Sequence, residues 1–158
     1  MVKVVLVQPE IPPNTGNIAR TCAATQTPLH LVGPLGFELS DRYLKRAGLD
    51  YWPHVDLHNH GAWADFQAHR QQTGRLVGFS TRGTANYLQF EFQAQDWLLF
   101  GQETAGLPAP VLAACDALVY IPISHDHVRS LNLSVSAALG LFEARRQLNL
   151  LNYPRSPL

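Results

Sequence analysis

Charge is scarce in this chain. Charged residues make up 15% of its 158 residues, whereas about 25% is typical of soluble globular domains. Lysine and arginine together number 12, as do aspartate and glutamate, so the formal net charge is zero. Any nucleic-acid partner would therefore have to be bound by a local basic patch. The low charge fraction also favours an oligomer that covers part of the chain's exterior.

Cysteines and long apolar runs are rare as well. The two cysteines, Cys22 and Cys115, form no C-x-x-C pair, which fits a reducing compartment. No apolar run approaches the roughly 18 residues of a membrane span, and the first residues are typical of a strand rather than of a signal peptide. These features predict a cytoplasmic protein with no membrane partner. The length predicts one domain, residues 1–158.

Several well-known site motifs are missing. No G-x-G-x-x-G follows a predicted strand, which argues against a Rossmann dinucleotide site. Residues 101–106 have the glycine spacing of a P-loop, but Leu107-Pro108 stands where Lys-Ser or Lys-Thr is required. Two groups of histidines are candidate metal ligands: His54, His58 and His60, and His125 and His127. No cysteine or paired carboxylate accompanies them, so we interpret them as polar surface and expect no metal ion.

Stretches typical of strands and of helices alternate along the chain. Strands are predicted at residues 2–7, 29–32, 51–57, 75–81, 97–100 and 117–121. Helices are predicted at residues 17–26, 40–47, 62–72 and 108–115, and a last helix begins within residues 130–134. Before the first helix, Pro9, Pro12 and Pro13 predict an extended segment, and residues 14–16 predict a turn. The alternation predicts an α/β fold with a mainly parallel sheet flanked by helices.

Three predicted strands are followed by polar or glycine-rich loops, at residues 81–83, 101–106 and 122–130. In parallel sheets, ligands bind beyond the carboxyl ends of the strands. If these loops converge, they form one pocket.

The last predicted helix begins among small polar residues. Ser130, Asn132 and Ser134 are each good N-cap residues, and Arg129 precedes them. One cap is enough for a helix, so the surplus favours a polar surface that holds a ligand at the helix N-terminus. The alternative is a well-capped helix that packs on the sheet. The helix also carries an apolar stripe that needs a partner surface, formed by Val135, Ala138, Leu139 and Phe142.

Three motifs occur in order along the chain. They read NTGNIAR at residues 14–20, LLFGQETAGLP at residues 98–108, and IPI at residues 121–123 with RSLNLS at residues 129–134. Together they resemble the three motifs of the SPOUT-type RNA 2′-O-ribose methyltransferases. The opening QPEIPPNTGNIAR, the central RAGLDYW and the length resemble one subfamily: small enzymes, without an added RNA-binding domain, that methylate the wobble nucleotide of tRNA, a cytidine or modified uridine.

The resemblance implies a fold that the pattern alone does not predict. In this family the C-terminal segment threads through a loop to form a deep trefoil knot, and the chain forms a homodimer whose active sites are completed across the interface. S-adenosyl-L-methionine is held mostly by backbone groups. Carried over to this sequence, those residues are Phe79, Gly101, Ile121 and Ser130. Backbone recognition explains why glycines and a proline, rather than a charged signature, mark the site.

The resemblance also implies catalytic roles. Arg20 lies beside the target 2′-hydroxyl in this family, and Asn14, Glu103, Ser130 and Asn132 organise its surroundings. Arg20 is either a general base or, because guanidinium stays protonated, a ligand of the target phosphate that activates the hydroxyl. Further cations are predicted to contact tRNA phosphates: Arg42, Lys45, Arg46, Arg129, Arg145 and Arg146. The loop that carries His125, Asp126 and His127 is slightly longer than in the subfamily, which bears on the placement of Arg129.

The expected function is therefore methylation of the tRNA wobble ribose. Two alternatives remain open at this point. The same chemistry could act on ribosomal RNA or on another tRNA position, or the chain could be a catalytically idle knotted dimer that only binds RNA. Intact Arg20, Glu103, Ser130 and Asn132 argue against the idle form.

Overall fold

A computed structural model describes residues 1–39 and 51–152 of the chain. The helix predicted at residues 40–47, with its candidate phosphate ligands Arg42, Lys45 and Arg46, lies outside the described residues. None of the helices in the described ranges is long and apolar enough to cross a membrane.

The described strands form one seven-stranded sheet of order β3-β2-β1-β6-β4-β7-β5, in which every paired neighbour is parallel. Their bounds are β1 Lys3–Val7, β2 Leu29–Val32, β3 Leu57–His60, β4 Leu76–Phe79, β5 Ala85–Asn86, β6 Trp97–Phe100 and β7 Ala117–Tyr120. This confirms the predicted α/β fold with a mainly parallel sheet. Both faces of the sheet are covered, which fits the nearly continuous apolar runs of the central strands, such as residues 4–7 of β1 and all of β6.

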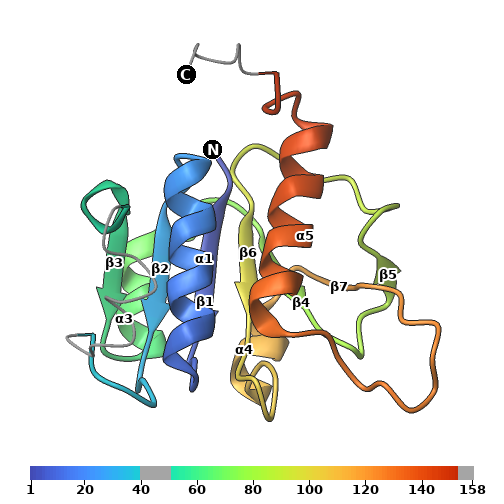
Figure 1. The fold of residues 1–158 in the computed structure, drawn as a ribbon, viewed down its shortest axis with the longest axis horizontal. Coiled ribbons are helices and arrows are strands. Elements are labelled where there is room, and N and C mark those ends of the chain that lie inside the picture. Colours follow the sequence, from blue (N-terminus) through green and yellow to red (C-terminus); the bar gives the residue numbers. More distant parts are fainter. Residues whose placement is uncertain (40–50, 153–158) are drawn as a thin grey trace.

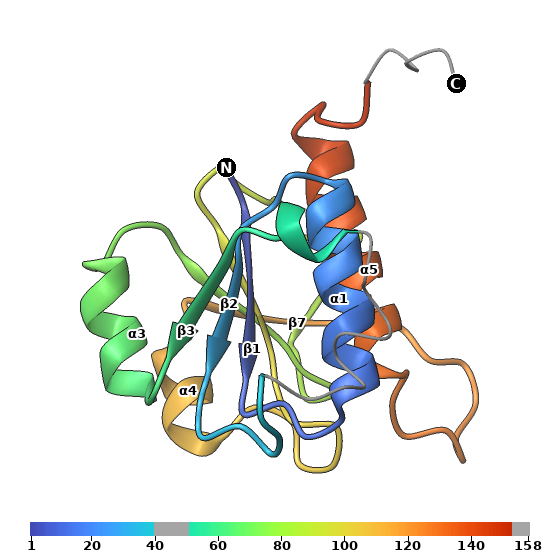
Figure 2. The same cartoon turned by 60° about the vertical axis from the view of Figure 1, so that its left-hand side comes forward.

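Helices cover the two faces of the sheet in separate layers. Helices α1 (Pro12–Ala24) and α5 (Leu133–Gln147) lie side by side on one face (Figure 1). Helices α3 (Trp63–Arg70) and α4 (Ala109–Ala114) lie on the other, as Figure 2 shows. Alternate residues of β1 enter the two cores: Val4 and Leu6 pack toward α1 and α5, and Val5 and Val7 toward α3 and α4.

Helix α1 begins earlier than predicted. Its first turn contains Pro12 and Pro13, and residues 14–16 are helical rather than a turn. Proline is tolerated there because the first N–H groups of a helix have no intrahelical partner in any case. The earlier start places Asn14 within the first turn of a helix that begins just after β1.

The segment at residues 51–57 is not the predicted strand. It contains a short 3-10 helix, η1 (Trp52–His54), and strand β3 begins only at Leu57. His58 and His60 therefore lie on a strand and not in a loop, and His60 is buried. Strand β5, two residues long at the sheet edge, was not predicted.

Candidate functional site

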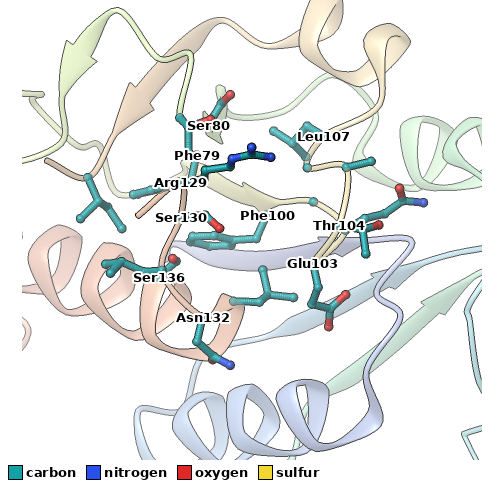
Figure 3. A pocket seen from close by; sticks show the side chains of 18 of the residues that line it. Phe79, Ser80, Phe100, Glu103, Thr104, Leu107, Arg129, Ser130, Asn132 and Ser136 are labelled. Carbon is teal, nitrogen blue, oxygen red and sulfur yellow. The ribbon is translucent and has the colours of Figure 1, made fainter. Parts of the chain in front are cut away.

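A pocket of about 610 Å³ opens at the carboxyl ends of β4, β6 and β7. All three predicted loops contribute to it, since Thr81, Gly101 and Arg129 are among its lining residues. The predicted convergence of the loops is confirmed. In Figure 3, Ser130, Asn132 and Ser136 border one side of the pocket, and Glu103, Thr104 and Leu107 border the other. The four residues implied to hold a cofactor also line it: Phe79, Gly101, Ile121 and Ser130.

The loop after β6 folds back closely on itself. The backbone N–H of Gln102 donates to the carbonyl of Gly106, and that of Gly106 donates to the carbonyl of Gln102, both at 3.0 Å. A Cβ on Gly101 would lie 2.1 Å from the carbonyl carbon of Gly106. Gly106 itself has φ +71°, a conformation that side chains disfavour. This wall of the pocket is therefore made largely of backbone.

A chain of hydrogen bonds joins three of the predicted catalytic residues. The Asn132 Nδ2 donates to Asn14 Oδ1 at 3.0 Å, and the Asn14 Nδ2 donates to Glu103 Oε1 at 3.1 Å. These residues come from the start of α5, the start of α1 and the loop after β6. Asn14 is buried, so both of its amide groups need the partners that they have here. The network fixes the three segments relative to one another beside the pocket.

Asn132 has a second task, as the N-cap of α5. Its Oδ1 accepts hydrogen bonds from the backbone N–H of Ser134 at 2.8 Å and of Val135 at 3.4 Å. The oxygen of the amide thus caps the helix, while its nitrogen reaches Asn14. The predicted capping by Asn132 is confirmed, and it does not exclude a role in the site.

Two carboxylates clamp the loop after β1 to the loop after β6. Glu103 accepts hydrogen bonds from the backbone N–H groups of Glu10 at 2.8 Å and Ile11 at 3.1 Å. Glu10 in return accepts from the Thr104 hydroxyl and from the Thr104 backbone N–H, the latter at 3.1 Å. Glu10 and Thr104 were not singled out from the sequence. Both lie within the motifs already quoted, but a pairing across 94 positions has no signature in local spacing.

Arg20 is not brought to the pocket of its own chain. It lies on the exposed side of α1, where its guanidinium carbon is 5.4 Å from the centre of the Tyr51 ring. Within the described part of the chain, the pocket is lined without it. Asn14 and Arg20 belong to the same motif, yet only Asn14 faces the network.

The remaining predicted cations differ in their surroundings. Arg129 is exposed and lines the pocket. Arg145 is buried, and its Nη2 donates to the carbonyl of Leu150 at 3.0 Å, so this side chain is not presented to a phosphate. Arg146 is exposed but makes two 2.8 Å hydrogen bonds to Glu143, and this guanidinium lowers the pKa of the Glu143 carboxyl. Of the three, Arg129 is the one that lines this pocket.

A parallel sheet whose strand ends open into a pocket of this size, walled by glycine backbone, is typical of α/β proteins that bind a small organic ligand. The chain belongs to the SpoU rRNA Methylase family, whose family model matches residues 1–142. This agrees with the resemblance drawn from the three motifs.

Similar proteins cover nearly the whole chain. A protein of Synechocystis is 62% identical over 96% of this chain and 99% of its own length. The tRNA (cytidine(34)-2′-O)-methyltransferase of Burkholderia cenocepacia is 46% identical over 93% of this chain and 96% of its own.

Solved structures agree with the fold. One, described as giving insights into the 2-OH methylation of C/U34 on tRNA, is 51% identical with a TM-score of 0.90, over 94% of this chain and 97% of that chain. The SpoU methyltransferase AviRb from Streptomyces viridochromogenes, in complex with the cofactor AdoMet, is 27% identical with a TM-score of 0.84, over 94% of this chain and 58% of that one.

Proposed function

We propose that this chain transfers a methyl group from S-adenosyl-L-methionine to the ribose 2′-hydroxyl of the wobble nucleotide of tRNA, in the cytoplasm. The observation that carries the proposal is the hydrogen-bonded set of Asn132, Asn14 and Glu103 beside the pocket, formed by residues of all three motifs. Two proteins similar to nearly the whole chain support it: one is named a tRNA (cytidine(34)-2′-O)-methyltransferase, and the other is a solved structure described by the 2-OH methylation of C/U34 on tRNA.

The pocket fits the methyl donor. Its volume of about 610 Å³ lies within the roughly 300–1,000 Å³ of small-molecule sites. A Cβ at Gly101 would fill the close approach between its loop and Gly106, so the tight backbone cradle depends on glycine. Phe79, Gly101, Ile121 and Ser130 would hold S-adenosyl-L-methionine, which supplies an electrophilic methyl group when bound.

The residues of the chain contribute mainly by positioning. The attacking 2′-oxygen would form a bond to the methyl carbon as the carbon–sulfur bond breaks, which releases S-adenosyl-L-homocysteine, and the hydroxyl proton would pass to solvent water. Alignment of two substrates in this way can lower the barrier by about 7–11 kcal/mol. The Asn132–Asn14–Glu103 network holds the segment with Ser130 against α1 and the loop after β6, which keeps the two binding sites in register.

We propose a homodimer in which the paired faces of α1 and α5 meet. Helix α5 packs on its own sheet through Ala137, Leu141 and Ala144. The apolar stripe noted in the sequence faces outward instead: Val135 is 47% exposed, Leu139 37% and Phe142 46%. A shallow groove of about 360 Å³ runs beside it, lined by Tyr87, Ala138, Leu139, Phe142, Glu143, Arg146 and Leu151. A partner subunit would cover this apolar surface.

Such a dimer would also account for Arg20. The exposed side of α1, which carries Arg20, adjoins α5 in the same layer. A subunit docked there could receive Arg20 into its own pocket, beside the target nucleotide. Because an exposed guanidinium remains a cation, it is suited to bind the target phosphate.

The trefoil knot is part of the same proposal. Residues 121–132 connect β7 to α5 and border the same pocket as the loop after β6. Strand β7 lies between β4 and β5, although it follows both in the chain. These placements support a connection that passes through the preceding loop.

The test is methyl transfer from labelled S-adenosyl-L-methionine to total tRNA from a strain without the endogenous activity, with the modified nucleoside mapped. A 2′-O-methyl mark confined to position 34 is expected. Incorporation into ribosomal RNA alone would overturn the substrate, and tRNA binding without any transfer would identify an idle RNA-binding protein.

Arg20→Ala tests the completion of the site across the interface. This variant should lose turnover while its affinity for S-adenosyl-L-methionine changes by no more than a few-fold. When Arg20→Ala subunits are mixed and re-associated with Asn132→Ser subunits, each mixed dimer holds one intact site, so about a quarter of the wild-type activity should return. No recovery would show that Arg20 serves its own chain.

A further inference from the structure

Four histidines lie together at the far edge of the sheet. His30 comes from β2, His58 and His60 from β3, and His69 from the last turn of α3. Parallel pairing sets His30 opposite His58, and residues two apart on a strand share a face, so the strand histidines project to the same side. This is the side that α3 covers, as Figure 2 shows. None of these histidines lines the pocket of the described chain.

The imidazole rings are close enough to share a ligand. His30 Nδ1 and His60 Nε2 are 3.0 Å apart, and the centre of the His69 ring lies 5.3 Å from that of His30 and 5.0 Å from that of His60. His30 is 2% exposed and His60 7%, whereas His69 is exposed. One potential ligand nitrogen from each of the three lies within 4.8 Å of the others.

The surroundings hold the buried His30 ring in place. The rings of Phe66 and Trp97 make edge-to-face contacts with the His30 ring, and their centroids lie 6.1 and 5.0 Å from the His30 centroid.

His58 completes the cluster from the outer side. Its ring stacks on His30 with centroids 4.4 Å apart, and its Nε2 lies 3.0 Å from a carboxylate oxygen of Asp56. It therefore supports the orientation of His30, while Asp56 holds His58 itself.

We propose that His30, His60 and His69 bind a divalent transition-metal ion such as Zn²⁺, at a site separate from the methyl-transfer pocket. Ligand nitrogens around tetrahedral zinc lie about 3.4 Å apart, given zinc–nitrogen bonds of about 2.0–2.1 Å. From the present separations of up to 4.8 Å, each ring must move by less than about 1 Å.

The exposed His69 supplies both the freedom for this adjustment and the path of entry. A metal bound here would join α3 and the edge strand β3 to β2. Its role is thus to stabilise this edge of the sheet, independently of the proposed reaction.

Zinc binding to the full-length protein tests the proposal. Protein without an affinity tag is stripped with EDTA and titrated with zinc chloride against a chromogenic chelator. We expect one zinc ion per chain and a rise in the unfolding temperature on binding. His69→Ala removes one ligand from an exposed position, where folding is not at risk, and should weaken zinc binding at least tenfold and abolish the thermal shift. His54→Ala removes an exposed histidine outside the cluster and should bind as the wild type does.

Three results would overturn the site. The wild type could bind zinc at less than one ion per chain, His69→Ala could bind it unchanged, or a His125→Ala, His127→Ala double variant could abolish binding, which would place the ion on the loop before Arg129. Cobalt provides a second measurement, because Co²⁺ in a tetrahedral site has intense visible absorption bands. These bands should be present in the wild type and in His54→Ala and absent in His69→Ala.

Discussion

Asn132→Ser separates the two tasks of one side chain. Serine is as good an N-cap as asparagine, so the first turn of α5 should keep its cap. The shorter side chain cannot reach Asn14, and the 3.0 Å hydrogen bond to Asn14 Oδ1 is lost. Asn14 is only 7% exposed, so its oxygen loses a partner at a cost of about 1 kcal/mol. Asn132→Ala loses the cap as well, which adds about 1 kcal/mol.

These free energies convert into measurable shifts. For a domain of this size, 1 kcal/mol lowers the unfolding temperature by about 2–4 °C. Asn132→Ser should therefore unfold about 3 °C below the wild type, and Asn132→Ala about 6 °C below it. The activity should respond differently. Release of the segment that carries Ser130 displaces the binding groups, and a displacement of about 1 Å can lower kcat by about 10²-fold.

The assay compares kcat, the KM for tRNA and the affinity for S-adenosyl-L-methionine in both variants. We expect both to lose kcat to a similar degree, although their stabilities differ. If Asn132→Ser keeps most of the wild-type kcat, the link to Asn14 does not position the site. If Asn132→Ser unfolds at as low a temperature as Asn132→Ala, serine does not cap α5, and the premise that the cap and the hydrogen bond to Asn14 can be separated is wrong.

Two further substitutions test the pocket wall and the proposed interface. Gly101→Ala places a Cβ 2.1 Å from backbone, so it should cost about 1–3 kcal/mol and abolish S-adenosyl-L-methionine binding in calorimetry. Gly106→Ala meets open space and should cost about 1–2 kcal/mol through its positive φ alone. If both variants lose S-adenosyl-L-methionine binding equally, the close backbone approach at Gly101 does not form the wall of the binding site. Phe142→Asp should produce monomers in light scattering and remove activity, whereas Val128→Asp, equally exposed at 46%, should remain dimeric.

The fold was largely predictable from the sequence because strand and helix patterns alternate strongly. Residues 29–32 and 97–100 were predicted with the bounds that β2 and β6 have. Strand β3 was misplaced because LHNH has one apolar residue and pairs only along the sheet edge. The predicted start of helix α1 is too late because proline usually interrupts helices and strands, whereas here two prolines occupy the first turn of the helix.

The site was predictable in its location but not in its contacts. The rule that ligands bind at strand carboxyl ends placed the pocket, and the motifs supplied Asn14, Glu103 and Asn132. The hydrogen bond between Asn132 and Asn14 spans 118 positions, and no local pattern encodes such a pairing. The burial of Arg145 is not predicted from the sequence. The apolar stripe of α5 predicts the buried side of the helix, but in the structure this stripe is exposed and Arg145 is buried.

The clamp between Glu10 and Glu103 with Thr104 has a consequence for how sequences of this family can vary. Each carboxylate accepts hydrogen bonds from the loop of the other, so neither loop keeps its shape alone. A substitution of Glu10 would leave the Thr104 hydroxyl and backbone N–H without the acceptor that they have here. Substitutions in these two motifs, which are distant in the chain, are therefore expected to be correlated.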